Sequence, residues 1–85
     1  MSYRIELRPA AMRALAHVNP HQRARLHGAI LLLAEDPRPP ASRKLSNRDG
    51  YRVRVGDYRI LYTIDDGVLL VVVVTVGHRR DVYRR

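Results

Sequence analysis

Residues 50–66, GYRVRVGDYRILYTIDD, carry the strongest structural signal in the sequence. Apolar side chains alternate with arginines over residues 51–55, and the two-residue period continues over residues 58–64. This period is typical of strands that bury one face. The Gly56-Asp57 pair between them predicts a two-residue hairpin loop, and Asp65-Asp66-Gly67 predicts a second hairpin. The stretch therefore predicts two antiparallel strands that lead into a third.

The flanking segments predict the third strand, a first strand and two helices. Val68 to Val76 is almost entirely apolar and predicts a central strand, and residues 3–7 alternate as a first strand does. A short helix is predicted over residues 9–18. A second helix begins at Pro20, with Asn19 as its N-cap, and its apolar stripe consists of Leu26, Ile30 and Leu33.

The segment between the helices and the hairpins is predicted to lack regular structure. Residues 36–42, DPRPPAS, cannot continue a helix and are expected to be extended, and residues 43–50 are polar and irregular. The resulting order is β-α-α-β-β-β. It predicts an α+β fold of one domain, residues 1–85, with a helical hairpin packed on one face of an antiparallel sheet and a short C-terminal tail or helical turn.

Arginine dominates the charge of the chain. There are 16 Lys and Arg against 8 Asp and Glu, a net charge of +8, and Lys44 is the single lysine. The arginine side chain is a planar fork that matches phosphate oxygens and stacks on bases. Such an excess predicts binding to nucleic acid or to an acidic protein partner. The sequence has no basic amphipathic helix with large apolar anchors, which argues against a membrane surface.

Other compositional features exclude several classes of site. The chain has no cysteine, which excludes disulfides and thiolate metal ligands and fits a reducing cytoplasm. No apolar segment reaches the length of a signal peptide or a membrane-spanning helix. No phosphate-cradling glycine loop or Ser/His/Asp set is present. We therefore expect a cytoplasmic protein without a metal, a small-molecule cofactor or a membrane partner.

Candidate functional side chains gather in the C-terminal half. If the helices cover one face of the sheet, Arg52, Arg54 and Arg59 lie together on the other, because a tight hairpin joins their strands. The tail follows the last strand directly, so Arg79 and Tyr83 can fold back toward them. Arginines on a solvent-facing sheet surface are common without a function. Three on one face beside the HRRDVY tail nevertheless favour a phosphate-binding surface.

Two residues near the C-terminus each have two interpretations. His78 follows the apolar strand and is either a proton acceptor or a residue that merely ends the strand. Tyr83 either packs the tail on the sheet, or has a functional role in which it stacks on a base or takes a proton. The tyrosines that alternate with the arginines are expected to face inward and to be structural; they are Tyr51, Tyr58 and Tyr62.

Two segments of the chain resemble the RelE family of bacterial and archaeal toxins. They are KLSNRDGYRVRVGDYRILYTIDDG, residues 44–67, and VGHRRDVYR, residues 76–84. The predicted first strand, helices and proline-bearing connector extend the resemblance over nearly the whole chain, as a single RelE-like toxin domain.

This resemblance implies a toxin that enters the ribosomal A site and cuts mRNA there, and that a cognate antitoxin restrains. Cutting of this kind needs no metal or cofactor, because the RNA 2′-hydroxyl attacks the adjacent phosphate. In the family the chemistry belongs to basic residues on the second and third strands, an arginine after the last strand and a C-terminal tyrosine. The matching residues are Arg52, Arg54, Arg59, Arg79 and Tyr83, with His78 where another basic residue is often found.

The sequence departs from the family pattern at two of these positions. Some well-studied members have lysines where Arg52 and Arg54 stand. A lysine can lose its proton and act as a base, whereas an arginine stays protonated. We therefore expect these two residues to bind phosphate and stabilise charge, Arg59 and Arg79 to hold the scissile phosphate, and Tyr83 or His78 to be the base.

Two alternatives belong to other functional classes. One is a toxin like the related ParE group, which acts on DNA gyrase through protein contacts and generally lacks the GHRRDVY arrangement. The other is a degenerate toxin that only binds its antitoxin and helps to repress their shared operon. All three hypotheses imply an antitoxin, and a wide basic face predicts one with acidic residues and amphipathic helices.

Overall fold

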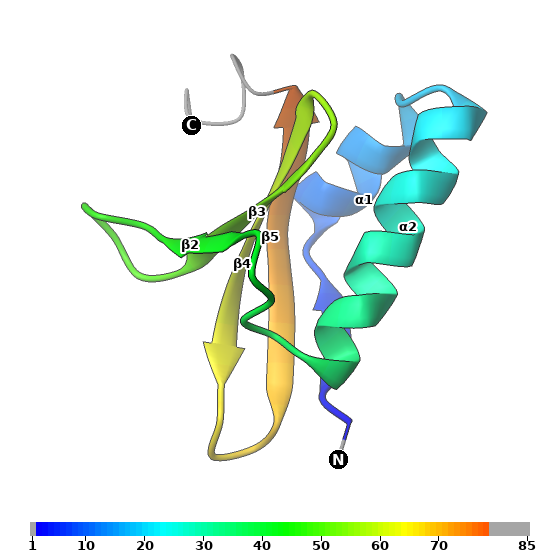
Figure 1. Cartoon of the computed structure of the whole chain (residues 1–85). Coiled ribbons are helices and arrows are strands. Elements are labelled where there is room, and N and C mark those ends of the chain that lie inside the picture. Colours follow the sequence, from blue (N-terminus) through cyan, green and yellow to red (C-terminus); the bar gives the residue numbers. More distant parts are fainter. Residues whose placement is uncertain (1, 79–85) are drawn as a thin grey trace.

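Two helices cover one face of a five-stranded sheet (Figure 1). The computed structural model describes residues 2–78 of the chain. The spatial strand order is β1-β5-β4-β3-β2, and the predicted α+β class, with a helical hairpin on one sheet face, is confirmed. In chain order the elements are β1 (Arg4–Leu7), α1 (Pro9–Ala16), α2 (Pro20–Glu35), β2 (Ser42–Lys44), β3 (Tyr51–Val55), β4 (Tyr58–Asp65) and β5 (Leu70–His78).

Local sequence signals set the start of each helix as predicted, at Pro9 and Pro20, whereas α1 ends at Ala16, two residues earlier than predicted. The side chain of Asn19 caps α2 by accepting a hydrogen bond of 2.9 Å from the backbone N–H of Gln22. Arg23 then reaches back from α2 to the end of α1 and the residues after it, where its Nε donates to the carbonyl of Leu15 at 2.9 Å and its Nη2 to that of Val18 at 2.8 Å. These bonds add acceptor contacts where α1 ends and hold the two helices together.

The β3–β4 hairpin follows the prediction, whereas the β4–β5 connection is longer than predicted. Gly56 has a φ of +61°, which the tight Gly56-Asp57 turn requires. The second turn occupies residues 66–69, because the Asp65 carboxylate accepts the N–H groups of Gly67 and Val68 at 2.9 and 3.3 Å. Strand β5 therefore starts at Leu70 and not at Val68.

The core lies between the helices and the sheet. It is a continuous cluster from α1, α2, β3, β4 and β5 that includes Leu26, Ile60 and Tyr62. Strand β5 has an irregularity here: Leu61 pairs with Thr75 and Tyr62 with Val73, so that Val74 is an extra residue. This bulge shifts the two-residue period, and both Val73 and Val76 are therefore buried in the core.

Two features of the sheet differ from the predicted architecture. Strand β1 pairs with β5 in parallel, so the sheet is mixed and not purely antiparallel. Because a helical hairpin and not a tight turn follows β1, the local sequence does not fix the direction of β1 relative to its neighbour. Residues 42–44, predicted to be extended and then irregular, form the strand β2, antiparallel to β3. With three residues and no apolar alternation, β2 has no sequence signal and depends on pairing with its neighbour.

The loop between β2 and β3 closes against the sheet at Gly50. This buried glycine has a φ of +124°, and a Cβ there would lie 2.9 Å from the carbonyl oxygen of Tyr62. We expect Gly50→Ala to lower the free energy of unfolding by about 1–3 kcal/mol, because the backbone must strain or move. Urea unfolding measures the change.

Gly28→Ala is the matched control for this substitution. Gly28 lies in α2, and a Cβ there meets nothing within 4 Å, so this change is expected to stabilise the protein by about 0.5–1 kcal/mol. Equal effects of the two substitutions would contradict the steric explanation for Gly50.

Candidate nucleic-acid interface

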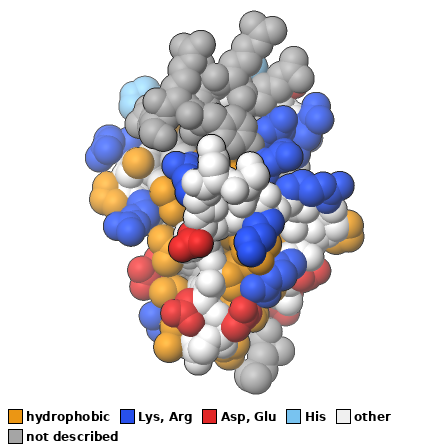
Figure 2. Space-filling view, turned by 90° about the vertical axis from the view of Figure 1, so that its left-hand side faces the viewer, with side chains coloured by type: hydrophobic (Ala, Val, Ile, Leu, Met, Phe, Trp, Pro, Cys, Tyr) orange, Lys and Arg blue, Asp and Glu red, His pale blue; other side chains and the backbone are white. Residues whose placement is uncertain are grey.

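A cationic groove lies on the face of the sheet that the helices leave open. It has a volume of about 650 Å³. Among the described residues, its lining consists of five basic residues together with Leu45, Ser46 and Asn47, and it includes no carboxylate. Figure 2 shows Lys and Arg side chains gathered on this side of the molecule, while acidic side chains lie toward the lower part of the view. The five basic residues, here called the groove cations, are Arg43, Lys44, Arg48, Arg52 and Arg59.

Strand register places arginines directly opposite one another on this face. Arg43 of β2 pairs with Arg52 of β3, and Arg54 of β3 pairs with Arg59 of β4. Like charges directly across a sheet destabilise it. Within residues 2–78 the ion pairs are Arg4–Glu6 and Arg38–Asp66, so these arginines meet no carboxylate in that part of the chain. The arrangement favours an anion that bridges them.

Arg59 is the groove cation with N–H groups that are buried and unpartnered within residues 2–78. Its Nε and Nη1 atoms are inaccessible to solvent and have no hydrogen-bond partner among the described residues. A buried charged donor without a partner is costly, and guanidinium N–H groups are strong donors to phosphate oxygens. Arg59 is therefore prepared to receive an oxyanion.

Arg54 and His78 lie outside the groove. The Nε of Arg54 donates to the carbonyl of Gly56 at 3.2 Å, and its exposed side chain lies beside the groove and not in its lining. His78 pairs with Tyr58 across the β4–β5 ladder, and the two rings meet edge to face, with centroids 6.0 Å apart. Because Tyr58 packs against the core, His78 lies on the helix side of the sheet, away from the arginines.

The structure thus gathers part of the predicted site and adds to it. It brings together Arg52 and Arg59 in the groove, with Arg54 adjacent; Arg79 and Tyr83 lie outside the described residues. Sequence reasoning missed the remaining groove cations, because their segment shows no strand period. The available signal was the density of charge after the prolines; the missed residues are Arg43, Lys44 and Arg48.

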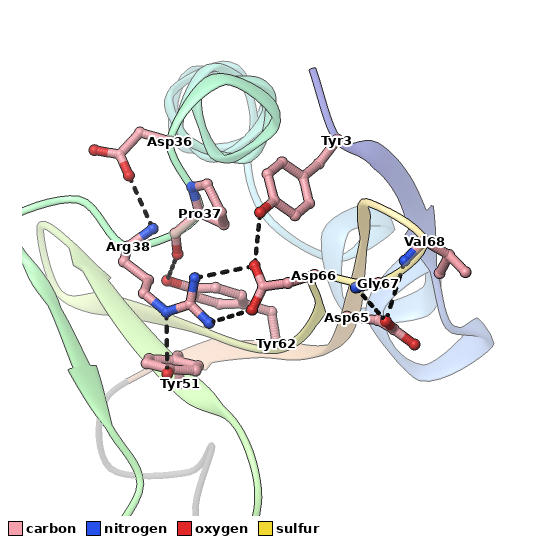
Figure 3. Close-up of polar contacts among 10 residues, drawn as sticks. All are labelled: Tyr3, Asp36, Pro37, Arg38, Tyr51, Tyr62, Asp65, Asp66, Gly67 and Val68. Atoms are coloured by element: carbon pink, nitrogen blue, oxygen red, sulfur yellow. Dashed lines mark hydrogen bonds and ion pairs between the residues drawn. The ribbon is translucent and has the colours of Figure 1, made fainter. Parts of the chain in front are cut away.

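A polar cluster fixes the connector that leads into β2 (Figure 3). The Arg38 guanidinium donates to both carboxylate oxygens of Asp66, at 3.2 and 2.9 Å, and the Tyr3 hydroxyl donates to the same carboxylate at 2.6 Å. Arg38 Nε also donates to the Tyr51 hydroxyl at 3.2 Å, and the guanidinium carbon lies 5.3 Å from the centre of that ring. We call Tyr3, Arg38, Tyr51 and Asp66 the Arg38 clasp.

Buried contacts support the clasp from within the sheet. The hydroxyl of the buried Tyr62 donates to the Pro37 carbonyl at 2.7 Å, and its ring stacks on that of Tyr51 with centroids 5.9 Å apart. Burial raises the pKa of Tyr62, which keeps this hydroxyl a donor. The connector is therefore tied to the sheet just before β2, and this positions the wall of the groove that β2 carries.

The clasp predicts a specific acid titration. Hydrogen bonds from Arg38 and then Tyr3 lower the pKa of Asp66 from its ordinary 3.8 to about 2. Because the folded pKa is depressed, the ionised carboxylate stabilises the fold above pH 3.8, and this contribution is lost as the pH falls from about 4 to 2. The side chains are substantially exposed, so the effect is modest. NMR titration of the Asp66 carboxyl should show a midpoint near 2.

Substitutions isolate the cause of this titration. In Arg38→Ala the Asp66 midpoint is expected to move back toward 3.8. In Asp66→Asn the melting temperature should depend less on pH between about 4 and 2 than in the unsubstituted chain. Asp57→Asn, in the exposed β3–β4 turn outside the clasp, is the control and should leave the Asp66 midpoint near 2. A normal Asp66 midpoint in the unsubstituted protein would rule the clasp out in solution.

Comparisons with known proteins agree with this fold. Residues 5–83 match the sequence model of a family described as the ParE toxin of type II toxin–antitoxin system, parDE. Toxin RelG of Mycobacterium tuberculosis is 46% identical over 46 residues, which are 54% of this chain and 51% of RelG. The match therefore spans about half the length of this curated relative.

Solved structures are similar over almost the whole chain. The toxin–antitoxin complex RelBE2 from M. tuberculosis contains a chain with a TM-score of 0.83 and 29% identity, covering 93% of this chain and 100% of that one. A mutant of the E. coli toxin RelE in the free state has a TM-score of 0.79 and 25% identity, covering 96% and 88%. The chain belongs to the ParE toxin family of type II toxin–antitoxin systems, within the RelE/ParE superfamily, and has the RelE fold.

Three further observations concern residues 2–78. No helix in this part of the chain is long and apolar enough to cross a membrane. His, Cys, Asp and Glu side chains do not come together there in groups of three that could hold a metal ion. His17, His21 and His27 are exposed.

Proposed function

We propose that this chain is a toxin that arrests translation by cutting mRNA in the ribosomal A site. Arg59 carries the proposal, because it lines the cationic groove and its Nε and Nη1 atoms are buried without a hydrogen-bond partner among the described residues. A site for phosphoryl transfer in RNA must hold one backbone phosphate and stabilise the negative charge that develops on it. Arg59 and Arg52 offer that stabilisation from adjacent strands.

The proposed reaction uses the RNA 2′-hydroxyl as the nucleophile. Its oxygen bonds to the adjacent phosphorus while the bond to the 5′-oxygen breaks, which leaves a 2′,3′-cyclic phosphate and a 5′-hydroxyl. One group takes the proton of the 2′-hydroxyl and another returns a proton to the leaving oxygen. Arginine cannot accept a proton, so in this proposal the groove arginines stabilise charge and Tyr83 takes the proton, with Arg79 on the phosphate.

The position of His78 favours Tyr83 as the base. The His78 ring packs against Tyr58, on the helix side of the sheet, whereas the phosphate would lie on the groove side with Arg52 and Arg59. A base must come within hydrogen-bond reach of the proton that it removes. Strand geometry therefore supports Tyr83 in preference to His78.

An antitoxin is the proposed protein partner in the cytoplasm. Solved relatives include the RelBE2 complex of M. tuberculosis and the RelE–RelB complex from Pyrococcus horikoshii. The groove cations predict acidic residues on the part of the partner that covers this face. Exposed apolar side chains on the helix layer offer a separate surface for an amphipathic helix; they are Met12, Leu31 and Leu32.

Cutting can be tested with purified ribosomes programmed with a defined mRNA. The proposal expects new message ends at codons in the A site, each bearing a cyclic phosphate, and much less cutting of the same message without ribosomes. Message that stays intact on ribosomes, from protein that arrests growth when expressed, would overturn it.

A ParE-like action on DNA gyrase is the second candidate, because the matching family model is that of ParE toxins. It predicts inhibition of gyrase supercoiling together with intact mRNA, and the two assays on one protein sample separate the candidates. Growth without arrest when the chain is expressed alone would instead favour the degenerate toxin that only binds its antitoxin.

A further inference from the structure

The groove is larger than the site for one phosphate requires. Arg52 and Arg59 form one wall, on β3 and β4, while β2 and the loop after it form the other. The second wall carries Arg43, Lys44 and Arg48, none of which the proposed cutting chemistry uses. Figure 1 shows β2 and its loop extending away from the helix layer on the open side of the sheet.

This second wall is held in place by the fold. The Nη1 atom of Arg43 donates to the carbonyls of Pro40 and Ser42 at 2.9 and 2.8 Å, which fixes its side chain. The loop is closed by a bond of 3.0 Å from the N–H of Leu45 to the carbonyl of Gly50, and Gly50 is buried against the sheet. The Arg38 clasp anchors the segment just before β2. The Arg43 side chain and the backbone that carries Lys44 and Arg48 are therefore positioned before any ligand arrives.

The positive charge of the second wall indicates a negatively charged ligand. Arg43 stands directly opposite Arg52, a like-charge pair that costs stability unless an anion lies between. The two walls together present five cations and, within residues 2–78, no carboxylate to the groove. A single phosphate cannot contact cations spread over three strands and a loop, whereas successive phosphates of one nucleic-acid strand can.

We propose that Arg43, Lys44 and Arg48 form a phosphate-binding arm that holds the RNA backbone next to the cutting position. This inference rests on the proposed function and extends it: the ligand is a single strand of several nucleotides, whose scissile phosphate lies at Arg59 and whose neighbouring phosphates lie along β2 and its loop. The arm is a binding element, and its residues take no part in bond breaking.

The test measures binding of full-length protein to single-stranded RNA with 2′-O-methyl groups, which cannot be cut. Fluorescence anisotropy would compare oligomers of about 3 and about 10 nucleotides over a range of salt concentrations, for the unsubstituted chain and for Arg43→Ala/Lys44→Ala/Arg48→Ala. The triple variant is expected to bind the long oligomer at least about tenfold more weakly, and to lose about 2 from the slope of log affinity against log salt. The short oligomer should be affected by less than about threefold.

Two controls keep the test decisive. Arg13→Ala removes one exposed positive charge from α1, in the helix layer, and should change neither affinity nor slope. Arg48→Glu reverses one exposed loop charge without altering β2, and should weaken binding of the long oligomer even if the triple variant is unstable.

Each other outcome has a distinct meaning. Unchanged affinity and salt slope in both arm variants would overturn the arm and leave the proposed cutting site standing. Failure of the unsubstituted chain to bind either oligomer would count against the proposed function itself. Equal competition by poly-glutamate of matched charge would assign the arm to an acidic protein partner, and so overturn it as an RNA site.

Discussion

Arg59→Ala is expected to slow ribosome-dependent cutting of mRNA by about 10²–10³-fold while the protein remains folded. The Nε and Nη1 atoms of Arg59 are buried without a hydrogen-bond partner among the described residues. Removal of the side chain therefore takes away charge stabilisation from the reacting phosphate without breaking a hydrogen bond or ion pair to another residue in the range 2–78. Single-turnover cutting rates measure the effect on chemistry, and thermal unfolding of the same sample measures the effect on the fold.

Two further substitutions define the role of Arg59. Arg59→Lys keeps the charge but loses the two-pronged donor, and should recover only part of the rate. Arg13→Ala removes a charge from the helix layer and should cut at the normal rate. If Arg59→Ala also cuts at the normal rate, the groove is not the site of the reaction.

Leu26→Ala is expected to lower the free energy of unfolding by about 2–5 kcal/mol. Leu26 is fully buried at the centre of α2, where it faces the sheet, so the substitution leaves a cavity between the two layers. A domain of this size has a net stability of roughly 5–10 kcal/mol. The loss is therefore a large fraction of the total, and the melting temperature should fall by more than about 10 °C.

Leu32→Ala in the same helix is the matched control. Leu32 is 69% exposed, whereas Leu26 is 0% exposed, so an identical chemical change there should shift the free energy of unfolding by less than about 0.5 kcal/mol. Comparable losses at both positions would mean that α2 packs differently in solution. Urea denaturation of both variants, with the slope compared, is sufficient to decide this.

Elements formed by neighbours in the sequence could be predicted from the sequence. Gly56-Asp57 between two alternating stretches specified the β3–β4 hairpin, and therefore the shared face of Arg52, Arg54 and Arg59, because a two-residue turn leaves one register. Asn19 with Pro20 specified the start of α2. Each of these signals acts within a few residues, where chain geometry alone limits the choices.

Elements that depend on distant partners could not be predicted in the same way. Strand β2 exists because residues 42–44 pair with β3, and the parallel direction of β1 is set by its pairing with β5. The bulge at Val74 shifts the pairing register along the β4–β5 ladder, and no local sequence period indicates it. The clasp likewise joins Arg38 to Asp66, 28 residues further along the chain.

The candidate site likewise has one part that the sequence predicts and one part that depends on the tertiary structure. The sequence by itself determined the arginine excess and placed Arg52, Arg54 and Arg59 on one face, since strand alternation is a local property. The tertiary structure alone decided that β2 and its loop face these arginines across a groove and that His78 points to the opposite side of the sheet. The physical reason is that side-chain direction follows from a period of two residues, whereas opposition across a groove follows from long-range backbone pairing and packing.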